Sequence, residues 1–162
     1  MTVETIVFGF CAGVAATATM DVLANVFQGV GLTVGAKGQW VGRWYLGIAR
    51  GQFVHSNIAV SPEQPGEKRA ALVGHYAIGI ALAVLYVAGA GWLGVSPGVF
   101  FVALGYGVAT SVFPWFLMFP AMGFGLLGLK GPPEFRLFTS SLMNHLVYGF
   151  GLWWIARVLQ LG

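Results

Sequence analysis

Four long apolar runs, almost free of charged residues, constrain this chain more than any other feature. They cover residues 5–30, 70–93, 98–126 and 135–161. About 20 residues of helix cross the hydrocarbon core of a bilayer, and backbone groups in lipid must bond to one another, as they do in a helix. The runs therefore predict an all-α membrane protein with four transmembrane helices, forming a single domain over residues 1–162. Pro114 and Pro120 lie inside the third run and should kink it.

The composition agrees with this class. Only 8% of the 162 residues are charged, whereas 57% are hydrophobic, and soluble domains carry about 25% charged residues. The basic residues do not cluster as in a nucleic-acid-binding surface, so we expect the lipid bilayer, and no nucleic acid, as the partner. The lone cysteine, Cys11, cannot form an internal disulfide and is expected to be a small buried residue.

The only long polar connection, residues 31–69, combines two kinds of sequence. Residues 38–53 place aromatic side chains beside Arg43 and Arg50, a mixture typical of an amphipathic segment lying in the membrane interface. Residues 61–67 contain two prolines and a glycine and predict a turn-rich loop in water. We therefore interpret Arg43 as an interfacial anchor and His55 as a surface histidine.

The basic residues predict how the helices are oriented. One lysine or arginine, Arg157, lies at one side of the four runs, and the other seven lie in the first and third connections. Loops rich in these residues stay in the cytoplasm. We expect both termini to be outside and the following seven residues to be cytoplasmic: Lys37, Arg43, Arg50, Lys68, Arg69, Lys130 and Arg136.

An internal similarity links the two halves of the chain. The pattern H-x-x-x-G-x-x-L begins at His75 in the second run and again at His145 in the fourth. A tandem repeat of two helical hairpins explains the match, and so does chance similarity between glycine-rich helices. In a true repeat, the two hairpins would be related by an axis along the membrane normal.

Polar residues inside the predicted helices are the candidates for function, because they are costly in lipid and face the interior of a bundle. In the first run they recur at every fourth position from Thr17 to Asn25, which places them on one helix face. His75 and His145 lie at depths in their helices that overlap that of Asp21. We expect one polar cluster in the cytoplasmic half of the membrane, formed by Thr17, Asp21, Asn25, His75, Asn144 and His145.

Three interpretations of this cluster remain open. It could brace the helices, at about 0.6 to 2 kcal/mol for each interhelical hydrogen bond. It could form a site that binds a small molecule or handles protons. His75 and His145 could also be ligands of a haem or metal ion, although no H-x-x-H spacing supports this. No cofactor is predicted, and haem or a metal is the minor alternative.

A series of short motifs covers nearly the whole chain. In order they are Ala16-Thr17-x-x-Met20-Asp21, Gly42-Arg43-Trp44, Gly51-x-Phe53-x-His55, Pro65-x-Glu67, His75-Tyr76-x-x-Gly79, Pro114-x-x-x-x-x-Pro120-x-x-Gly123-x-Gly125, Pro133-x-x-Arg136, His145 and Tyr148-Gly149-x-Gly151-Leu152. With this order of motifs the chain resembles the bacterial multi-pass membrane proteins catalogued as domain of unknown function 2938. It departs from their pattern at Phe119, where a glutamine is expected, and in the bulky residues 126–129.

The resemblance implies a bacterial inner-membrane location but no activity. It groups Asp21, Arg43, His55, His75 and His145 as one constellation. The chain lacks a nucleophile elbow, a phosphate-binding loop and an H-E-x-x-H motif, which argues against an enzyme with a soluble substrate. We expect a small membrane protein that binds or moves a small solute or proton, with a homodimer if it transports. The alternative is an accessory subunit that packs against partner membrane proteins.

Overall fold

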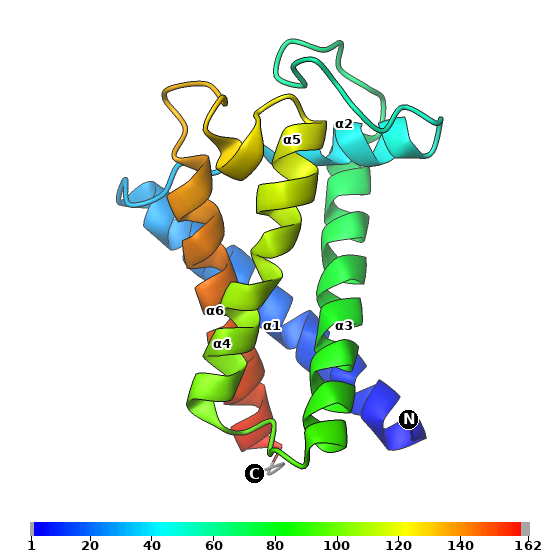
Figure 1. Ribbon diagram of the computed structural model, residues 1–162, viewed down its shortest axis with the longest axis vertical. Coiled ribbons are helices and arrows are strands. Elements are labelled where there is room, and N and C mark those ends of the chain that lie inside the picture. The colour runs from blue at the N-terminus through cyan, green and yellow to red at the C-terminus, as the bar shows by residue number, and fades with distance from the viewer. Residues whose placement is uncertain (1, 160–162) are drawn as a thin grey trace.

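The computed structural model describes residues 2–159, which form helices and loops and no β-strand. The helices are α1 (Val3–Gly29), α2 (Gly38–Ile48), α3 (Glu67–Leu93), α4 (Phe100–Thr110), α5 (Phe119–Ala121) and α6 (Leu137–Val158). The four long helices, which are α1, α3, α6 and the irregular helix that starts with α4 and ends with α5, run between the two ends of the molecule, and α2 lies across the upper end (Figure 1). Because α1 begins and α6 ends at the lower end, both long connections are at the upper end. The all-helical prediction is confirmed.

Glycines determine how closely the long helices approach one another. A Cβ on Gly13 of α1 would lie 2.5 Å from the Cα of Ile80 in α3. Likewise, a Cβ on Gly107 of α4 would lie 2.4 Å from the carbonyl oxygen of His145 in α6. The backbones therefore touch at these two crossings, as small residues permit in membrane bundles. α6 also packs against α1, which joins the two helix pairs into one bundle.

The helix that begins with α4 is irregular at its two prolines. A π-helical turn, η1 (Pro114–Met118), follows α4, and the short α5 ends one residue after Pro120. Proline has no N–H to continue the helical hydrogen bonds, and Gly123 and Gly125 then adopt positive φ angles of 86° and 70°. The predicted run 98–126 is therefore too long, because the helix ends at Ala121 and the chain turns away through the 3-10 turn η2 (Leu126–Gly128).

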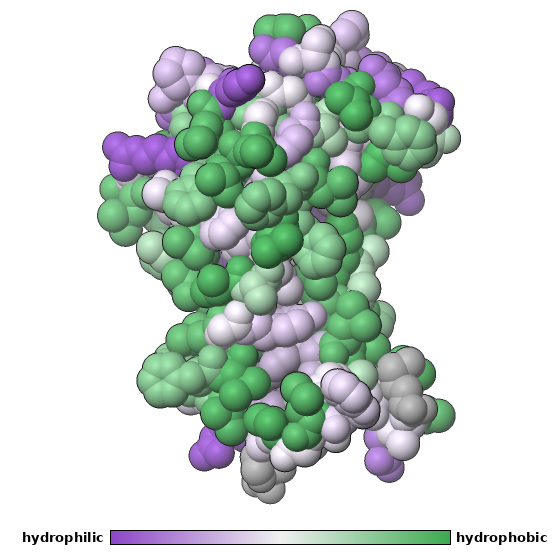
Figure 2. All heavy atoms as spheres, in the orientation of Figure 1, coloured by the Kyte–Doolittle hydropathy of each residue, from purple (hydrophilic) through white to green (hydrophobic). Residues whose placement is uncertain are grey.

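Within residues 2–159, three helices are long and apolar enough to cross a membrane: α1, α3 and the continuous segment Phe100–Ala121. Strongly hydrophilic residues gather at the upper end, whereas the middle of the molecule is mostly hydrophobic (Figure 2). These features indicate a membrane protein.

Cys11 is exposed on the outside of α1, so the prediction that it is buried is wrong. A small apolar residue at this position faces outward with its neighbour Phe10.

The segment between α1 and α3 packs on the bundle through its aromatic residues. Trp40 and Trp44 of α2 are buried with Ile58, Phe119 and other residues of the upper connections. The predicted amphipathic segment is present as α2, but its indole rings do not point into a membrane interface. They form the centre of a small core that covers the upper end of the four long helices.

Candidate functional site

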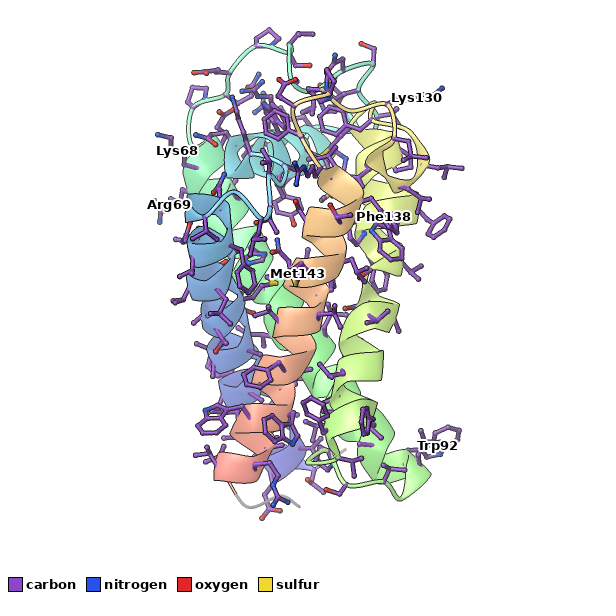
Figure 3. The ribbon with its side chains drawn as sticks, turned by 90° about the vertical axis from the view of Figure 1, so that its left-hand side faces the viewer. Lys68, Arg69, Trp92, Lys130, Phe138 and Met143 are labelled. Atoms are coloured by element: carbon purple, nitrogen blue, oxygen red, sulfur yellow. The ribbon has the colours of Figure 1, made fainter. Side chains whose placement is uncertain are left out.

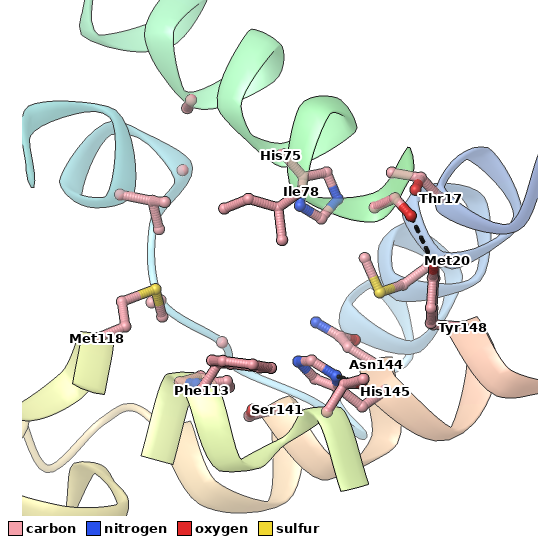
Figure 4. A pocket seen from close by; sticks show the side chains of 18 of the residues that line it. Thr17, Met20, His75, Ile78, Phe113, Met118, Ser141, Asn144, His145 and Tyr148 are labelled. Atoms are coloured by element: carbon pink, nitrogen blue, oxygen red, sulfur yellow. Dashed lines mark hydrogen bonds between the residues drawn. The ribbon is translucent and has the colours of Figure 1, made fainter. Parts of the chain in front are cut away.

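A cavity of about 740 Å³ lies below α2, between α1, α3, α4 and α6. Figure 4 shows side chains from opposite walls pointing toward one another across it. Most of the lining is apolar, with a few polar groups, which is the usual composition of a small-molecule site. Polar residues of the four long helices that line it are Thr17, Asp21, Lys68, His75, Thr110, Ser141, Asn144, His145 and Tyr148.

On one wall of the cavity, His75 of α3 is hydrogen-bonded to Asp21 of α1. The Nε2 atom of His75 lies 3.0 Å from Oδ1 of Asp21. The two helices are held together at a deeper level by the contact between Gly13 and Ile80, which brings their polar faces into register. Both side chains remain partly exposed, at 38% for His75 and 40% for Asp21. The pair can therefore reach a molecule in the cavity.

On the opposite wall, His145 of α6 is oriented by Thr110 of α4. The hydroxyl of Thr110 donates a hydrogen bond of 2.6 Å to the carbonyl oxygen of Gly107, and Oγ1 of Thr110 lies 2.7 Å from Nδ1 of His145. With the hydroxyl proton directed to Gly107, Nδ1 of His145 is the donor to Thr110. A neutral imidazole in this tautomer keeps Nε2 as a hydrogen-bond acceptor.

Two buried hydroxyl groups in the cavity wall are not hydrogen-bonded. Thr17 Oγ1 and Ser141 Oγ have no partner among the described residues, although Tyr148 nearby donates a hydrogen bond of 2.6 Å to the carbonyl oxygen of Gly79. A buried polar group without a partner costs about 1–3 kcal/mol. Both oxygens are themselves buried, so they mark a polar part of the cavity wall that packing leaves without a partner.

Comparison with known proteins identifies the family but brings no activity. A family model described as "Protein of unknown function (DUF2938)" matches residues 10–159. The chain belongs to the DUF2938 family. The match includes every residue that lines the cavity, and it confirms the resemblance found in the sequence. No curated protein and no solved structure matches the chain.

In this DUF2938 protein, Arg43 lies outside the cavity and is buried, with 5% of its surface exposed. Its Nε and Nη2 atoms donate to the two carboxylate oxygens of Glu67, at 2.8 and 3.1 Å. Nη1 donates to the carbonyl oxygens of Ile58 and Ser61. The hydrogen bonds with Glu67 raise the pKa of Arg43 further above its usual value. Arg43 therefore joins α2 to α3 and to the loop between them, and the prediction of an interfacial anchor is wrong.

His55 is also buried, so the prediction of a surface histidine is wrong. Only 7% of its surface is exposed, and its backbone N–H donates a hydrogen bond of 2.7 Å to the carbonyl oxygen of Ala121. Its Nε2 atom has no partner within residues 2–159. Burial, together with the positive charge of Arg43, lowers the pKa of His55 below its usual value. His55 fastens the loop after α2 to the end of α5.

Among the expected site residues, Asn25 is the one on α1 that does not reach the cavity. It is exposed on the surface, because the polar stripe of α1 continues beyond the region where α1 contacts its neighbours. Two functional neighbours were not predicted from sequence. Tyr148 could have been found as the third member of a polar stripe on α6 with Ser141 and His145. Glu67, the partner of Arg43, had no comparable periodic signal.

The described residues contain no group of three His, Cys, Asp or Glu side chains that could hold a metal ion. A group bound by both histidines would have to use Nδ1 of His75, because its Nε2 is hydrogen-bonded to Asp21, and Nε2 of His145, because its Nδ1 is hydrogen-bonded to Thr110.

Proposed function

We propose that this DUF2938 protein crosses the inner membrane of a bacterium four times and binds a small molecule in its central cavity. The fourth crossing is α6, whose 22 residues are enough for a bilayer of about 30 Å. Its hydropathy is lowered by Asn144 and His145, which line the cavity, and by Arg157 in its last turn. These residues do not place a charge in the middle of the lipid, because the side chain of an arginine near a helix end can extend to the membrane interface.

The orientation that we propose places α2 and the upper connections in the cytoplasm. Positively charged side chains of the upper end include Lys68, Arg69 and Lys130, which project outward in Figure 3, while Arg157 lies in the last turn of α6 near the lower end. Loops rich in lysine and arginine stay on the cytoplasmic side. Both termini are then outside.

A tandem origin of the two helix pairs is supported by equivalent contacts. Gly13 of α1 contacts α3 beside Gly79, and Gly107 of α4 contacts Gly149 of α6. In each pair, a histidine four residues before the second glycine is hydrogen-bonded to the partner helix, His75 to Asp21 and His145 to Thr110. The order up, down, up, down of the four helices (Figure 1) makes the two pairs parallel, as a repeat of hairpins requires.

Binding is supported by one observation above all, the open cavity between the two hydrogen-bonded histidines. Protein interiors are close-packed, so a cluster that only braced helices would be expected to bring its polar groups into direct contact. Here Asp21–His75 and Thr110–His145 stay on opposite walls of a space of about 740 Å³. The ligand is a small molecule with groups that accept and donate hydrogen bonds, and the Asp21–His75 pair offers it a site for a proton.

The test is to look for a molecule that remains bound to the purified protein. Native mass spectrometry of protein released from detergent micelles would compare the wild type with Asp21→Asn, His145→Gln and Asn25→Ala. We expect a bound small molecule in the wild type and in Asn25→Ala, whose side chain is exposed outside the cavity, and its loss in the other two variants at unchanged unfolding temperature. A brace predicts the opposite: no bound molecule in any sample, and similar destabilisation by Asp21→Asn and His145→Gln.

A further inference from the structure

The cavity continues to the outer surface of the bundle between α3 and the segment formed by α4 and η1. Two residues on each edge line the cavity and are exposed at the same time: Ile78 and Ala81 on α3, and Phe113 and Leu117 on the other edge. Ile78 is 47% exposed, Phe113 55% and Leu117 57%. Ile78 and Phe113 face each other across the space in Figure 4. We call these four residues the lateral window.

The lateral window has a limit above and below. On the lower side, the hydroxyl of Tyr106 donates a hydrogen bond of 2.7 Å to the carbonyl oxygen of Leu82, which links α4 to α3. The ring of Tyr106 also packs against Tyr86, with centroids 4.9 Å apart. On the upper side, Trp44 of α2 and Phe119 line the cavity. The window is thus framed within the helical part of the molecule, where lipid chains surround the protein.

Because the window is apolar and the interior of the cavity carries polar groups, a suitable ligand has an apolar chain and a polar head. Only a chain or ring system without charge fits between Ile78 and Phe113 in contact with lipid. The interior offers the Asp21 carboxylate and Nε2 of His145 as acceptors. These groups suit a head that carries a hydroxyl group.

Charge excludes an anionic head. The Asp21 carboxylate lies in the cavity wall, and a like charge beside it in an apolar setting is strongly unfavourable. Among the described lining residues one lysine and no arginine is present, Lys68 in the first turn of α3, well above the window. A fatty acid or a phospholipid headgroup is therefore a poor match for the interior.

We propose that the cavity takes an uncharged, hydroxyl-bearing amphipathic molecule directly from the bilayer through the lateral window. The hydroxyl head reaches Asp21 and His145, and the apolar chain lies between Ile78 and Phe113. This inference rests on the binding function proposed for the cavity and names the class of ligand and its route.

The probe is a long-chain alcohol, hexadecanol, carrying a photoreactive diazirine in its chain and an alkyne for detection. Full-length protein in proteoliposomes would be irradiated with the probe, and the adducts would be mapped by mass spectrometry. We expect adducts at the window residues and competition by unlabelled hexadecanol but not by hexadecanoate. Asp21→Asn should weaken the competition by about tenfold, the effect of one lost hydrogen bond to a charged group.

A bulky residue in the window provides the matched test of the route. Ile78→Trp should lower labelling inside the cavity by about tenfold or more, because the indole narrows the opening. Leu85→Trp is the control, since Leu85 is exposed two turns further along the same face of α3 and does not line the cavity. Equal labelling around positions 78 and 85 would show only lipid at the protein surface and would overturn the inference.

The outcomes separate this inference from the proposed function. If hexadecanoate competes as well as hexadecanol, the uncharged head is refuted. If Ile78→Trp leaves cavity labelling unchanged while Asp21→Asn abolishes it, the route through the window is refuted, although the cavity still binds. A bound molecule without an apolar chain, found by native mass spectrometry, would refute the ligand class and leave the binding function standing.

Discussion

At the scale of single residues, polar side chains differ in how completely their hydrogen-bonding groups are used. The Nε and Nη2 atoms of Arg43 donate hydrogen bonds to both carboxylate oxygens of Glu67, and both residues are buried. Around the cavity, by contrast, Thr17 and Ser141 keep hydroxyls without partners in the described residues. Groups whose hydrogen bonds are all used hold helices together, whereas the hydroxyls without a partner mark the polar part of the cavity wall.

The Arg43–Glu67 ion pair leads to a stability prediction. Arg43→Gln leaves the Glu67 carboxylate buried without its partner, which typically costs about 3–5 kcal/mol. We expect a marked fall in the unfolding temperature in detergent. Arg50→Gln is the control, because Arg50 is exposed and donates a hydrogen bond to the side chain of Gln64, so the expected change is within about 0.5 kcal/mol. Equal effects of the two substitutions would show that the buried pair has no special role.

His55 predicts a pH dependence of stability. Its pKa in the folded protein is below the usual 6.5, so as the pH falls below that value the unfolded chain takes up a proton that the folded chain does not. Stability is therefore complete above pH 6.5 and decreases toward acid, by at most about 1.4 kcal/mol for each pH unit. The substitution His55→Gln removes the imidazole and therefore this difference in proton uptake. Unfolding temperatures measured from about pH 7 to pH 5 should fall more steeply for the wild type, and parallel curves would contradict the prediction.

The positions of Asp21, His75 and His145 in the bundle could be predicted from the sequence better than those of the residues around them. Asp21, His75 and His145 are rare polar residues in apolar runs, and their depth follows from helix geometry alone. The burial of Arg43 and His55 could not be predicted, because it depends on the loop of residues 49–66 folding back over α2, which has no periodic signal in the sequence. Which hydroxyls lack partners depends on packing details that no pattern encodes.

At the scale of helices, the two crossings at glycines determine where the cavity lies. Gly13 and Gly107 let α1 touch α3 and α4 touch α6. Because each pair is held tightly at its own crossing, the space between the pairs stays open above them.

The helix bounds were mostly predictable from the apolar runs. The early end at Ala121 was not, because residues 122–129 are apolar and only the backbone angles of Gly123 and Gly125 reveal the turn.

The crossing of α4 and α6 can be tested with one methyl group. In Gly107→Ala the new Cβ would lie 2.4 Å from a backbone carbonyl of α6, so the helices must separate, at a cost of about 1–3 kcal/mol. Gly105→Ala lies on the same helix and meets nothing within 4 Å. We expect a lower unfolding temperature for Gly107→Ala and little change for Gly105→Ala. A similar stability of both variants would show that the crossing tolerates a wider separation.

At the scale of the whole molecule, charge and apolarity are distributed along one axis. The upper end carries α2, its ion pair and the outward lysines and arginines, and the middle is covered by hydrophobic side chains (Figure 2). The cavity lies just below this upper end, between the long helices.

The orientation in the membrane follows from the difference in charge between the two ends of the molecule. Single cysteines would replace Glu63, exposed in the loop after α2, and Glu4, exposed in the first turn of α1, in a Cys11→Ala background. Both substitutions remove the same side chain, so the pair is matched. Because the end with Lys68, Arg69 and Lys130 should stay inside, an impermeant thiol reagent added to spheroplasts should modify position 4 and spare position 63 until the membrane is opened. The reverse pattern would invert the topology, and modification of both positions in intact spheroplasts would mean that the chain inserts in two orientations.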